Sequence, residues 1–391
     1  MLIKNVLLED GRKTSILIDG NKIKYIGVPA DTESDEVIEA EGMAILPAFY
    51  NTHTHTAMNL LRGYADDMPL QKWLNEYIWP FEAKMTADDM AEGSRLAVGE
   101  MMRTGTVGFN DMYFHVERTA RIAEEAGMRA IVAEAFFQHT ISTLDSYIQQ
   151  LQQFQGSGTD SHHLVRMAVA PHAIYTNSTE SLQKAARAAR ENGVPINIHV
   201  AETKEEVKNC VKATGMTPVR YLDSIGLLGP DVNAAHCVWL DREEWDIMAE
   251  RGVTVSHCPC SNMKLGSGRF PYRDAIASGV RLTLGTDGAA SNNNLDMREE
   301  MKFAALLAKV EGDVECLPAA EIMKWATRNG AEALGVDAGI IAEGKIADCI
   351  LIDMNDCRMQ PCHNLISNWV YAASSDCITT VICDGKVLFR R

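Results

Sequence analysis

The sequence predicts an α/β protein, in which a (β/α)8 TIM-like barrel carries a small β-sandwich domain formed by both ends of the chain. Eight short apolar segments alternate with amphipathic helical segments between residues 44 and 284, which is typical of parallel βαβ units. Both ends of the chain instead contain short strand-like segments and turns. The length of 391 residues accommodates a barrel of roughly 250 residues plus an appendage.

The two ends of the chain share the alternating hydrophobicity of β strands. The segments expected to be strands are Leu2–Leu8, Thr14–Ile18, Lys22–Ile26, Asp348–Asp353 and Thr379–Cys383. Asp19-Gly20-Asn21 and Asp384-Gly385 have the composition of hairpin turns. We therefore expect one composite β-sandwich domain of residues 1–46 and 346–391, with two unrelated flaps as the alternative, around a barrel of residues 47–345.

The central part of the chain supplies the barrel strands and the helices between them. The expected strands are Ala44–Ala48, Thr106–Asp111, Ala130–Ala135, Val165–Ala170, Ile196–Val200, Val232–Ala235, Val253–Ser256 and Arg281–Leu284. The clearest expected helices are Thr86–Thr104, Val116–Ala126, Ser181–Asn192 and Arg242–Arg251. Gln149–Ser161 is the most linker-like stretch. Eight such units favour a closed barrel over an open sheet.

Composition excludes several classes of partner. The net charge of −16 disfavours nucleic acids and anionic membrane surfaces, because both are bound mainly through Lys and Arg. No apolar run approaches the ~20 residues of a membrane span, and residues 1–20 do not resemble a signal peptide. The ten cysteines include no CxxC pair and are expected to be reduced thiols of a cytoplasmic protein. The oligomeric state, including a homo-oligomer, is left open.

Residue types that bind metals follow the expected strands, where barrel active sites are built. His53 and His55 follow the first strand and, two residues apart in extended backbone, point the same way. His199, His236 and Asp287 follow strands five, six and eight. An HxH pair alone is weak evidence for a metal site. Metal-binding residue types that recur at the ends of four strands are much stronger evidence. Imidazoles with one carboxylate suit zinc, and iron as a second choice.

Glu202 is the candidate acid–base residue. It follows His199 by three residues, and a carboxylate beside a metal-activated water can transfer protons. Glu205 and Glu206 are interpreted as solvated loop glutamates. The histidines interpreted as surface or structural residues are His115, His139, His162, His163 and His363.

These motifs together resemble the amidohydrolase superfamily over nearly the whole chain. The residues that match its metal and catalytic positions in order are Thr52-His53-Thr54-His55, His199, His236 and Asp287. Binuclear members use a bridging lysine on the fourth strand, but residues Arg166 to Pro171 contain none. The resemblance therefore implies one divalent metal per chain.

Several stretches resemble the 5′-methylthioadenosine/S-adenosylhomocysteine deaminases more closely. They are Trp73–Glu82, His199–Thr203, Ser256–Gly266 and Asp287–Asn292. The resemblance implies that Glu82 binds the ribose hydroxyls of a nucleoside and that His172 contacts the nucleoside too. A carboxylate accepts hydrogen bonds from vicinal hydroxyls, and an imidazole can bond a ribose oxygen or ring nitrogen.

The expected reaction is hydrolytic deamination of a small-molecule nucleoside. His53, His55, His199 and Asp287 would hold the metal, Asp287 would accept the proton of the attacking water, and Glu202 would protonate adenine N1 while His236 steadies the hydroxide. The expected substrates are adenosine, 5′-deoxyadenosine, 5′-methylthioadenosine and S-adenosylhomocysteine. The alternatives are deamination or dechlorination of another heterocycle, such as guanine, oxoguanine or a triazine, and a catalytically inactive binding barrel. A binding barrel would be expected to lack a metal ligand or Glu202.

One position departs from the family pattern. Some members place arginines after the third strand to hold the amino-acid tail of S-adenosylhomocysteine. This chain has Glu134 there, and no Arg or Lys occurs from Ala130 through Val165. We therefore expect Glu134 to contact the 5′ substituent and to favour small neutral groups over that tail.

Overall fold

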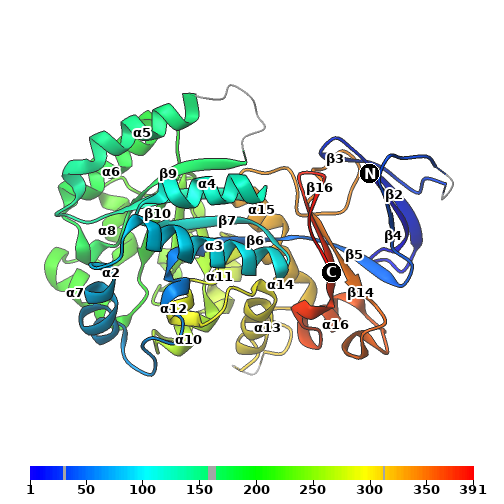
Figure 1. Cartoon of the computed structure of the whole chain (residues 1–391). Coiled ribbons are helices and arrows are strands. Elements are labelled where there is room, and N and C mark those ends of the chain that lie inside the picture. Colours follow the sequence, from blue (N-terminus) through cyan, green and yellow to red (C-terminus); the bar gives the residue numbers. More distant parts are fainter. Residues whose placement is uncertain (30–31, 157–163, 311–312) are drawn as a thin grey trace.

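The computed structural model of the protein describes residues 1–29, 32–156, 164–310 and 313–391. Two eight-stranded sheets organise them, one forming the barrel and the other built from both ends of the chain beside it (Figure 1). In these ranges, no helix has both the length and the apolar character needed to cross a membrane.

The barrel sheet contains eight parallel strands in sequence order, as predicted. They are β6 (Phe49–Thr54), β7 (Thr106–Tyr113), β8 (Arg129–Phe136), β9 (Val165–Pro171), β10 (Ile196–Val200), β11 (Val232–His236), β12 (Thr254–His257) and β13 (Arg281–Leu284). The last strand meets the first through a parallel bridge between Thr54 and Asp287, where the Asp287 N–H donates to the His53 carbonyl at 3.0 Å. This contact brings the metal-type residues of strands one and eight together.

Helices surround the barrel, and several of them start at residues whose side chains cap the helix. The main ones are α3 (Ala87–Arg103), α4 (Val116–Ala126), α5 (Leu144–Gly156), α6 (Thr179–Glu191), α7 (Lys204–Thr214), α8 (Pro218–Ser224), α9 (Arg242–Glu250), α11 (Tyr272–Ser278), α13 (Met297–Leu307), α14 (Ala319–Ala326) and α15 (Arg328–Ala333). Thr86, Ser178 and Asp241 each close a capping box at the starts of α3, α6 and α9. Such caps satisfy helix N–H groups that lack an internal partner.

A helical segment between β6 and α3 covers part of the cavity described below. It comprises the 3-10 turn Thr56–Leu61, α1 (Leu70–Lys72), the wide π turn Trp73–Ile78 and α2 (Trp79–Glu82). Trp73, Leu74 and Ile78 are buried in a separate apolar cluster that also includes Tyr113 and Leu265. The Trp73–Glu82 stretch is thus packed against the loops that follow the strands.

Ala44–Ala48, predicted to be the first barrel strand, belongs to the other sheet. β5 (Met43–Pro47) pairs antiparallel with β14 (Cys349–Asp353), and the first barrel strand is β6. The apolar run continues from one strand into the other, so hydrophobicity alone does not separate them. The linker-like stretch Gln149–Ser161 is helical up to Gly156 in α5, and the rest of it lies outside the described residues.

Both ends of the chain contribute to the second sheet, as predicted. Its other strands are β1 (Leu2–Leu7), β2 (Lys13–Asp19), β3 (Lys22–Ile26), β4 (Val37–Glu39), β15 (Ile378–Cys383) and β16 (Lys386–Arg390). Side chains from distant strands, including Ile23 and Ile382, share one core. Arg129 on β8 ties this sheet to the barrel through ion pairs with Asp348 at 2.8 Å and Asp384 at 2.7 Å.

Candidate active site

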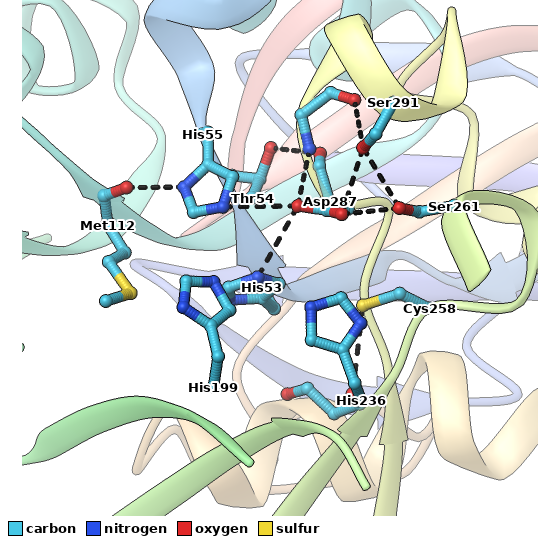
Figure 2. A network of polar contacts seen from close by, with 12 residues as sticks. His53, Thr54, His55, Met112, His199, His236, Cys258, Ser261, Asp287 and Ser291 are labelled. Atoms are coloured by element: carbon cyan, nitrogen blue, oxygen red, sulfur yellow. Dashed lines mark hydrogen bonds and ion pairs between the residues drawn. The ribbon is translucent and has the colours of Figure 1, made fainter. Parts of the chain in front are cut away.

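Four histidines and one aspartate converge at the carboxyl ends of the barrel strands (Figure 2). Two groups have ligand atoms within 4.8 Å of one another, namely His53 with His199 and His236, and His53 with His55 and Asp287. Asp287 Oδ1 lies 3.2 Å from His55 Nε2 and 3.6 Å from His53 Nε2. The structure thus brings together every residue that the sequence assigned to the metal centre.

Hydrogen bonds at the far side of the rings orient two of these imidazoles. His55 Nδ1 faces the Met112 carbonyl, and His199 Nδ1 lies 2.8 Å from the His172 carbonyl. A carbonyl only accepts, so each Nδ1 carries a hydrogen, and Nε2 is the ring nitrogen that remains to face the site. This is the usual outer-sphere arrangement of metal-binding histidines.

His53 supplies the test of whether the residues fit a metal ion. Its Nε2 is buried and has no hydrogen-bond partner among the described residues, which is costly unless another group satisfies it. Burial lowers the pKa of His53 to about 4, so the ring is neutral. A neutral, buried imidazole nitrogen beside a second imidazole and a carboxylate is the donor set that zinc takes. The site therefore fits a divalent metal ion.

Asp287 is held in place by its neighbours. Its Oδ2 accepts hydrogen bonds from Ser261 Oγ at 2.5 Å and Ser291 Oγ at 2.9 Å, and its Oδ1 accepts from the Gly288 N–H at 2.9 Å. Burial alone would raise the pKa of Asp287, but the nearby His53 and His55 rings hold it well below its usual range. The carboxylate is therefore ionised.

The backbone near Asp287 requires a small residue. A Cβ at Gly285 would lie 2.8 Å from both the Cβ and the carbonyl oxygen of His53. Asp287 itself has φ +59°, in the left-handed region that non-glycine residues rarely adopt. His236 and Ala201, at two other strand ends, share this property with φ +71° and +48°. Such backbone is often found at functional sites.

Glu202 and His236 face each other across the cavity. Glu202 is only 5% exposed, and its Oε1 accepts a hydrogen bond from Ser267 Oγ at 3.0 Å. Its Oε2 lies 3.8 Å from His236 Nε2, while His236 Nδ1 lies 2.8 Å from Asn262 Oδ1. Burial raises the pKa of Glu202, which favours a carboxyl able to donate a proton.

A cavity lies over these groups. Apolar and aromatic side chains form most of its wall, including Met58, Leu70, Trp73, Leu74, Trp79, Met112, Phe114, Phe137, Tyr175 and Leu265. Convergent polar groups in an otherwise apolar cavity are typical of a small-molecule site.

Glu82 and His172 line the same cavity as Glu202 and Asp287. Glu82 Oε1 accepts a hydrogen bond from Tyr113 OH at 2.6 Å, and burial raises the pKa of Glu82. The His172 ring stacks on Phe137 with 4.7 Å between ring centroids, and burial lowers the pKa of His172 to about 3. Both residues thus lie beside the cluster of four histidines and Asp287. Glu82 is there as a hydrogen-bond acceptor and His172 as a neutral ring.

Glu134 lies in a neighbouring cavity rather than in this one. The two cavities share Trp79, Glu82, Phe114 and Phe137 as lining residues, and the second also contains His115 and His139. Burial raises the pKa of Glu134 to about 7, although the N–H groups of Val116 and His115 at the start of α4 lower it. Glu134 therefore lines a cavity that adjoins the first one at these four residues.

The interpretation of Glu206 as a solvated loop residue is wrong. Both Glu205 and Glu206 lie in the first turn of α7, and only Glu205 is exposed, whereas Glu206 is 5% exposed. Ser261, Asn262 and Ser267 were also not identified from the sequence, although Ser261 and Asn262 lie within the Ser256–Gly266 stretch and Ser267 directly follows it. These uncharged side chains contact other site residues, and serine or asparagine in such a role has no recognisable sequence motif. His162 and His163 lie outside the described residues.

Comparison with known proteins assigns the family. Residues 44–388 match the model of the amidohydrolase family. The chain is 45% identical over 385 residues to a 5′-deoxyadenosine deaminase of Methanothermobacter thermautotrophicus, covering 97% of this chain and 90% of that protein. It is 46% identical over 398 residues to 5-methylthioadenosine/S-adenosylhomocysteine deaminase 1 of Archaeoglobus fulgidus, covering 99% and 93%.

A solved structure agrees with this assignment. The crystal structure of an adenosine deaminase from Xanthomonas campestris with bound zinc superimposes with a TM-score of 0.92 at 34% identity, covering 99% of this chain and 92% of that one. The fold, the metal-type cluster and the relatives agree, and the chain therefore belongs to the amidohydrolase family.

Proposed function

We propose that the protein catalyses hydrolytic deamination of a 5′-modified adenosine to the corresponding inosine analogue and ammonia. The observation that carries the proposal is the arrangement of the cavity, where the acid–base pair Glu202 and Asp287 faces the nucleoside-type residues Glu82 and His172. Two relatives that cover nearly the whole chain bear the names of deaminases of such nucleosides, which supports it.

In this proposal, His53, His55, His199 and Asp287 hold one divalent ion per chain, with zinc as the first choice and iron as the second. When bound, such an ion lowers the pKa of water toward ~7 and so supplies hydroxide at neutral pH. The orphaned Nε2 of His53 and the ionised Asp287 support this ligand set.

The chain's own residues then move the protons. Asp287 takes the proton of the attacking water, and Glu202 donates a proton to adenine N1, which makes C6 more electrophilic. The bond between C6 and the water oxygen forms while His236, which faces Glu202 across the cavity, steadies that oxygen. Asp287 then returns its proton to the exocyclic nitrogen, the bond between C6 and that nitrogen breaks, and ammonia leaves. The hydroxyl proton on C6 passes to Glu202, which regenerates the acid and leaves a carbonyl at C6 beside N1–H. Neither carboxylate forms a covalent bond to the substrate.

An ammonia-release screen tests this function directly. Adenosine, 5′-deoxyadenosine, 5′-methylthioadenosine, S-adenosylhomocysteine, guanine and cytosine are offered to the zinc-loaded protein. We expect release from adenosine-type nucleosides alone. Release only from a nucleobase would favour the alternative deaminase of another heterocycle, and no release from any of the six would favour an inactive binding barrel.

Glu82 should determine the requirement for ribose hydroxyls. Glu82→Ala removes the acceptor that would bind the 2′ and 3′ hydroxyls, so kcat/KM for adenosine should fall about 10–100-fold, the loss of a hydrogen bond to a charged group. For 2′,3′-dideoxyadenosine, kcat/KM should change little. Tyr113→Phe, which removes only the hydrogen bond to Glu82, serves as the control. Equal losses on both substrates would contradict the assignment.

Glu134 should select against the tail of S-adenosylhomocysteine. The carboxylate of that tail would enter a cavity lined by Glu134 with no Lys or Arg among its lining residues, which costs desolvation and repulsion. We expect 5′-deoxyadenosine and 5′-methylthioadenosine to have higher kcat/KM than S-adenosylhomocysteine. The difference should grow as the pH rises through 7, because Glu134, whose pKa is about 7, then becomes charged.

Substitutions at the same position provide the check. Glu134→Arg should raise kcat/KM for S-adenosylhomocysteine and so reduce its difference from the neutral nucleosides. Glu134→Gln should make this difference in kcat/KM less dependent on pH. A wild-type preference for S-adenosylhomocysteine over both neutral nucleosides would overturn this role of Glu134 while leaving the deaminase proposal intact.

A further inference from the structure

Two adjacent glutamates at the start of α7 have opposite environments. The Glu205 side chain is 61% exposed, whereas Glu206 is buried with 5% of its surface exposed. Glu206 Oε1 accepts a hydrogen bond from the Ala201 N–H at 2.8 Å, and Oε2 accepts one from the Glu202 N–H at 2.9 Å. One carboxylate thus holds two consecutive amides, the second of which belongs to the acid–base candidate.

The peptide segment that Glu206 holds is an unusual one. Ala201 has φ +48°, a conformation that an alanine adopts only when its surroundings impose it. Its carbonyl oxygen accepts hydrogen bonds from the N–H groups of Val238 at 3.1 Å and Trp239 at 3.0 Å. Both polar groups of Ala201 are therefore engaged, and the turn directs the next side chain back toward the cavity.

Helix capping does not account for Glu206. Thr203 caps α7 by accepting a hydrogen bond from the Glu206 N–H at 3.1 Å. In a capping box, the Glu206 carboxylate would bond back to the N–H of Thr203. It instead reaches past Thr203 to the two residues before it. Burial of an ionisable group opposes folding unless its hydrogen bonds compensate. Among the described residues, the hydrogen bonds of the Glu206 carboxylate go to the turn.

We propose that Glu206 is a positioning residue, which fixes the Ala201–Glu202 turn so that the Glu202 carboxyl stays between Ser267 and His236. This inference rests on the proposed deamination, since it assigns Glu206 a role only through Glu202. A carboxylate suits the task because both of its oxygens accept. An amide has one acceptor, and its NH2 group would face a backbone N–H.

The test is a double-mutant cycle with a matched control. Glu206→Gln should lower kcat for 5′-deoxyadenosine about 10–100-fold, the range that follows an ångström-scale misplacement of a reacting group. KM and the metal content should stay within about twofold of the wild type, because neither the metal site nor the nucleoside contacts are changed. Glu205→Gln, one residue away and exposed, should behave as the wild type.

The Glu202→Gln background separates positioning from general structural damage. If Glu206 acts through Glu202, adding Glu206→Gln to Glu202→Gln should lower kcat by less than about twofold further. A purely structural defect would multiply the two losses. Near-normal kcat in Glu206→Gln, or multiplied losses in the double variant, would overturn the proposal.

Amide hydrogen exchange gives a readout that does not depend on activity. In Glu206→Gln, the amides of Ala201 and Glu202 should exchange faster, while those of the α7 interior keep their protection. Unchanged exchange at both amides would also overturn the proposal. If Glu206→Gln fails to fold, Glu206→Asp replaces it, because the shorter carboxylate reaches only one amide and the same comparisons apply. A wild type that releases no ammonia would refute the deaminase proposal instead, whatever the exchange shows.

Discussion

Glu202→Gln should lower kcat for 5′-deoxyadenosine by about 10²–10⁴-fold, the usual contribution of a general acid–base group. An amide keeps the shape of the side chain and can still accept a hydrogen bond from Ser267 Oγ, which now lies 3.0 Å from Glu202 Oε1. It cannot release or take up a proton near neutral pH. The loss should therefore appear in turnover rather than in folding or metal content.

Three measurements separate a loss of acid–base catalysis from a loss of folding or of bound metal. Steady-state kinetics gives kcat and KM, elemental analysis gives the metal content, and thermal unfolding reports the fold. Glu205→Gln is the control, since that glutamate is exposed and lies three residues away. Near-normal turnover in Glu202→Gln would show that Glu202 is a buried loop residue without an acid–base role.

His55→Ala should remove the metal and the activity together. His55 Nε2 lies 3.2 Å from Asp287 Oδ1, and its Nδ1 is held by the Met112 carbonyl, so the ring is already aimed at the site. Losing an outer-sphere partner typically costs 10–100-fold in metal affinity, and losing a ligand should cost more. We expect about one zinc or iron per wild-type chain, and nearly none in the variant after dialysis.

Added metal distinguishes loss of affinity from loss of fold. Chelation should abolish wild-type activity and zinc should restore it, whereas His55→Ala should recover only part of its activity at high zinc. His363→Ala, at an exposed histidine, is the control. Two metal ions per chain together with a modified lysine would contradict the single-metal proposal, as would full metal content in His55→Ala.

The sequence alone was sufficient to predict the barrel and the residues that meet at the carboxyl ends of its strands. Strand and helix periodicities are local, so segments such as Val116–Ala126 and Ile196–Val200 have the predicted bounds in the structure. The carboxyl ends of parallel strands meet at one end of a barrel. For that reason, His53, His199 and Asp287 could be placed together although more than 200 residues separate the first from the last.

The tertiary structure alone decided which sheet an apolar strand joins and which polar side chains are buried. One apolar run, residues 43–50, covers Met43–Pro47 and the start of Phe49–Thr54, and only the pairing of Met43–Pro47 with Cys349–Asp353 assigns that strand to the terminal sheet. Glu205 and Glu206 are the same residue type in the same helical turn. Only the direction of the turn at Ala201 determines that Glu205 faces solvent, whereas Glu206 accepts hydrogen bonds from two backbone amides. Residue type and spacing do not encode such contacts, because they depend on how distant segments pack.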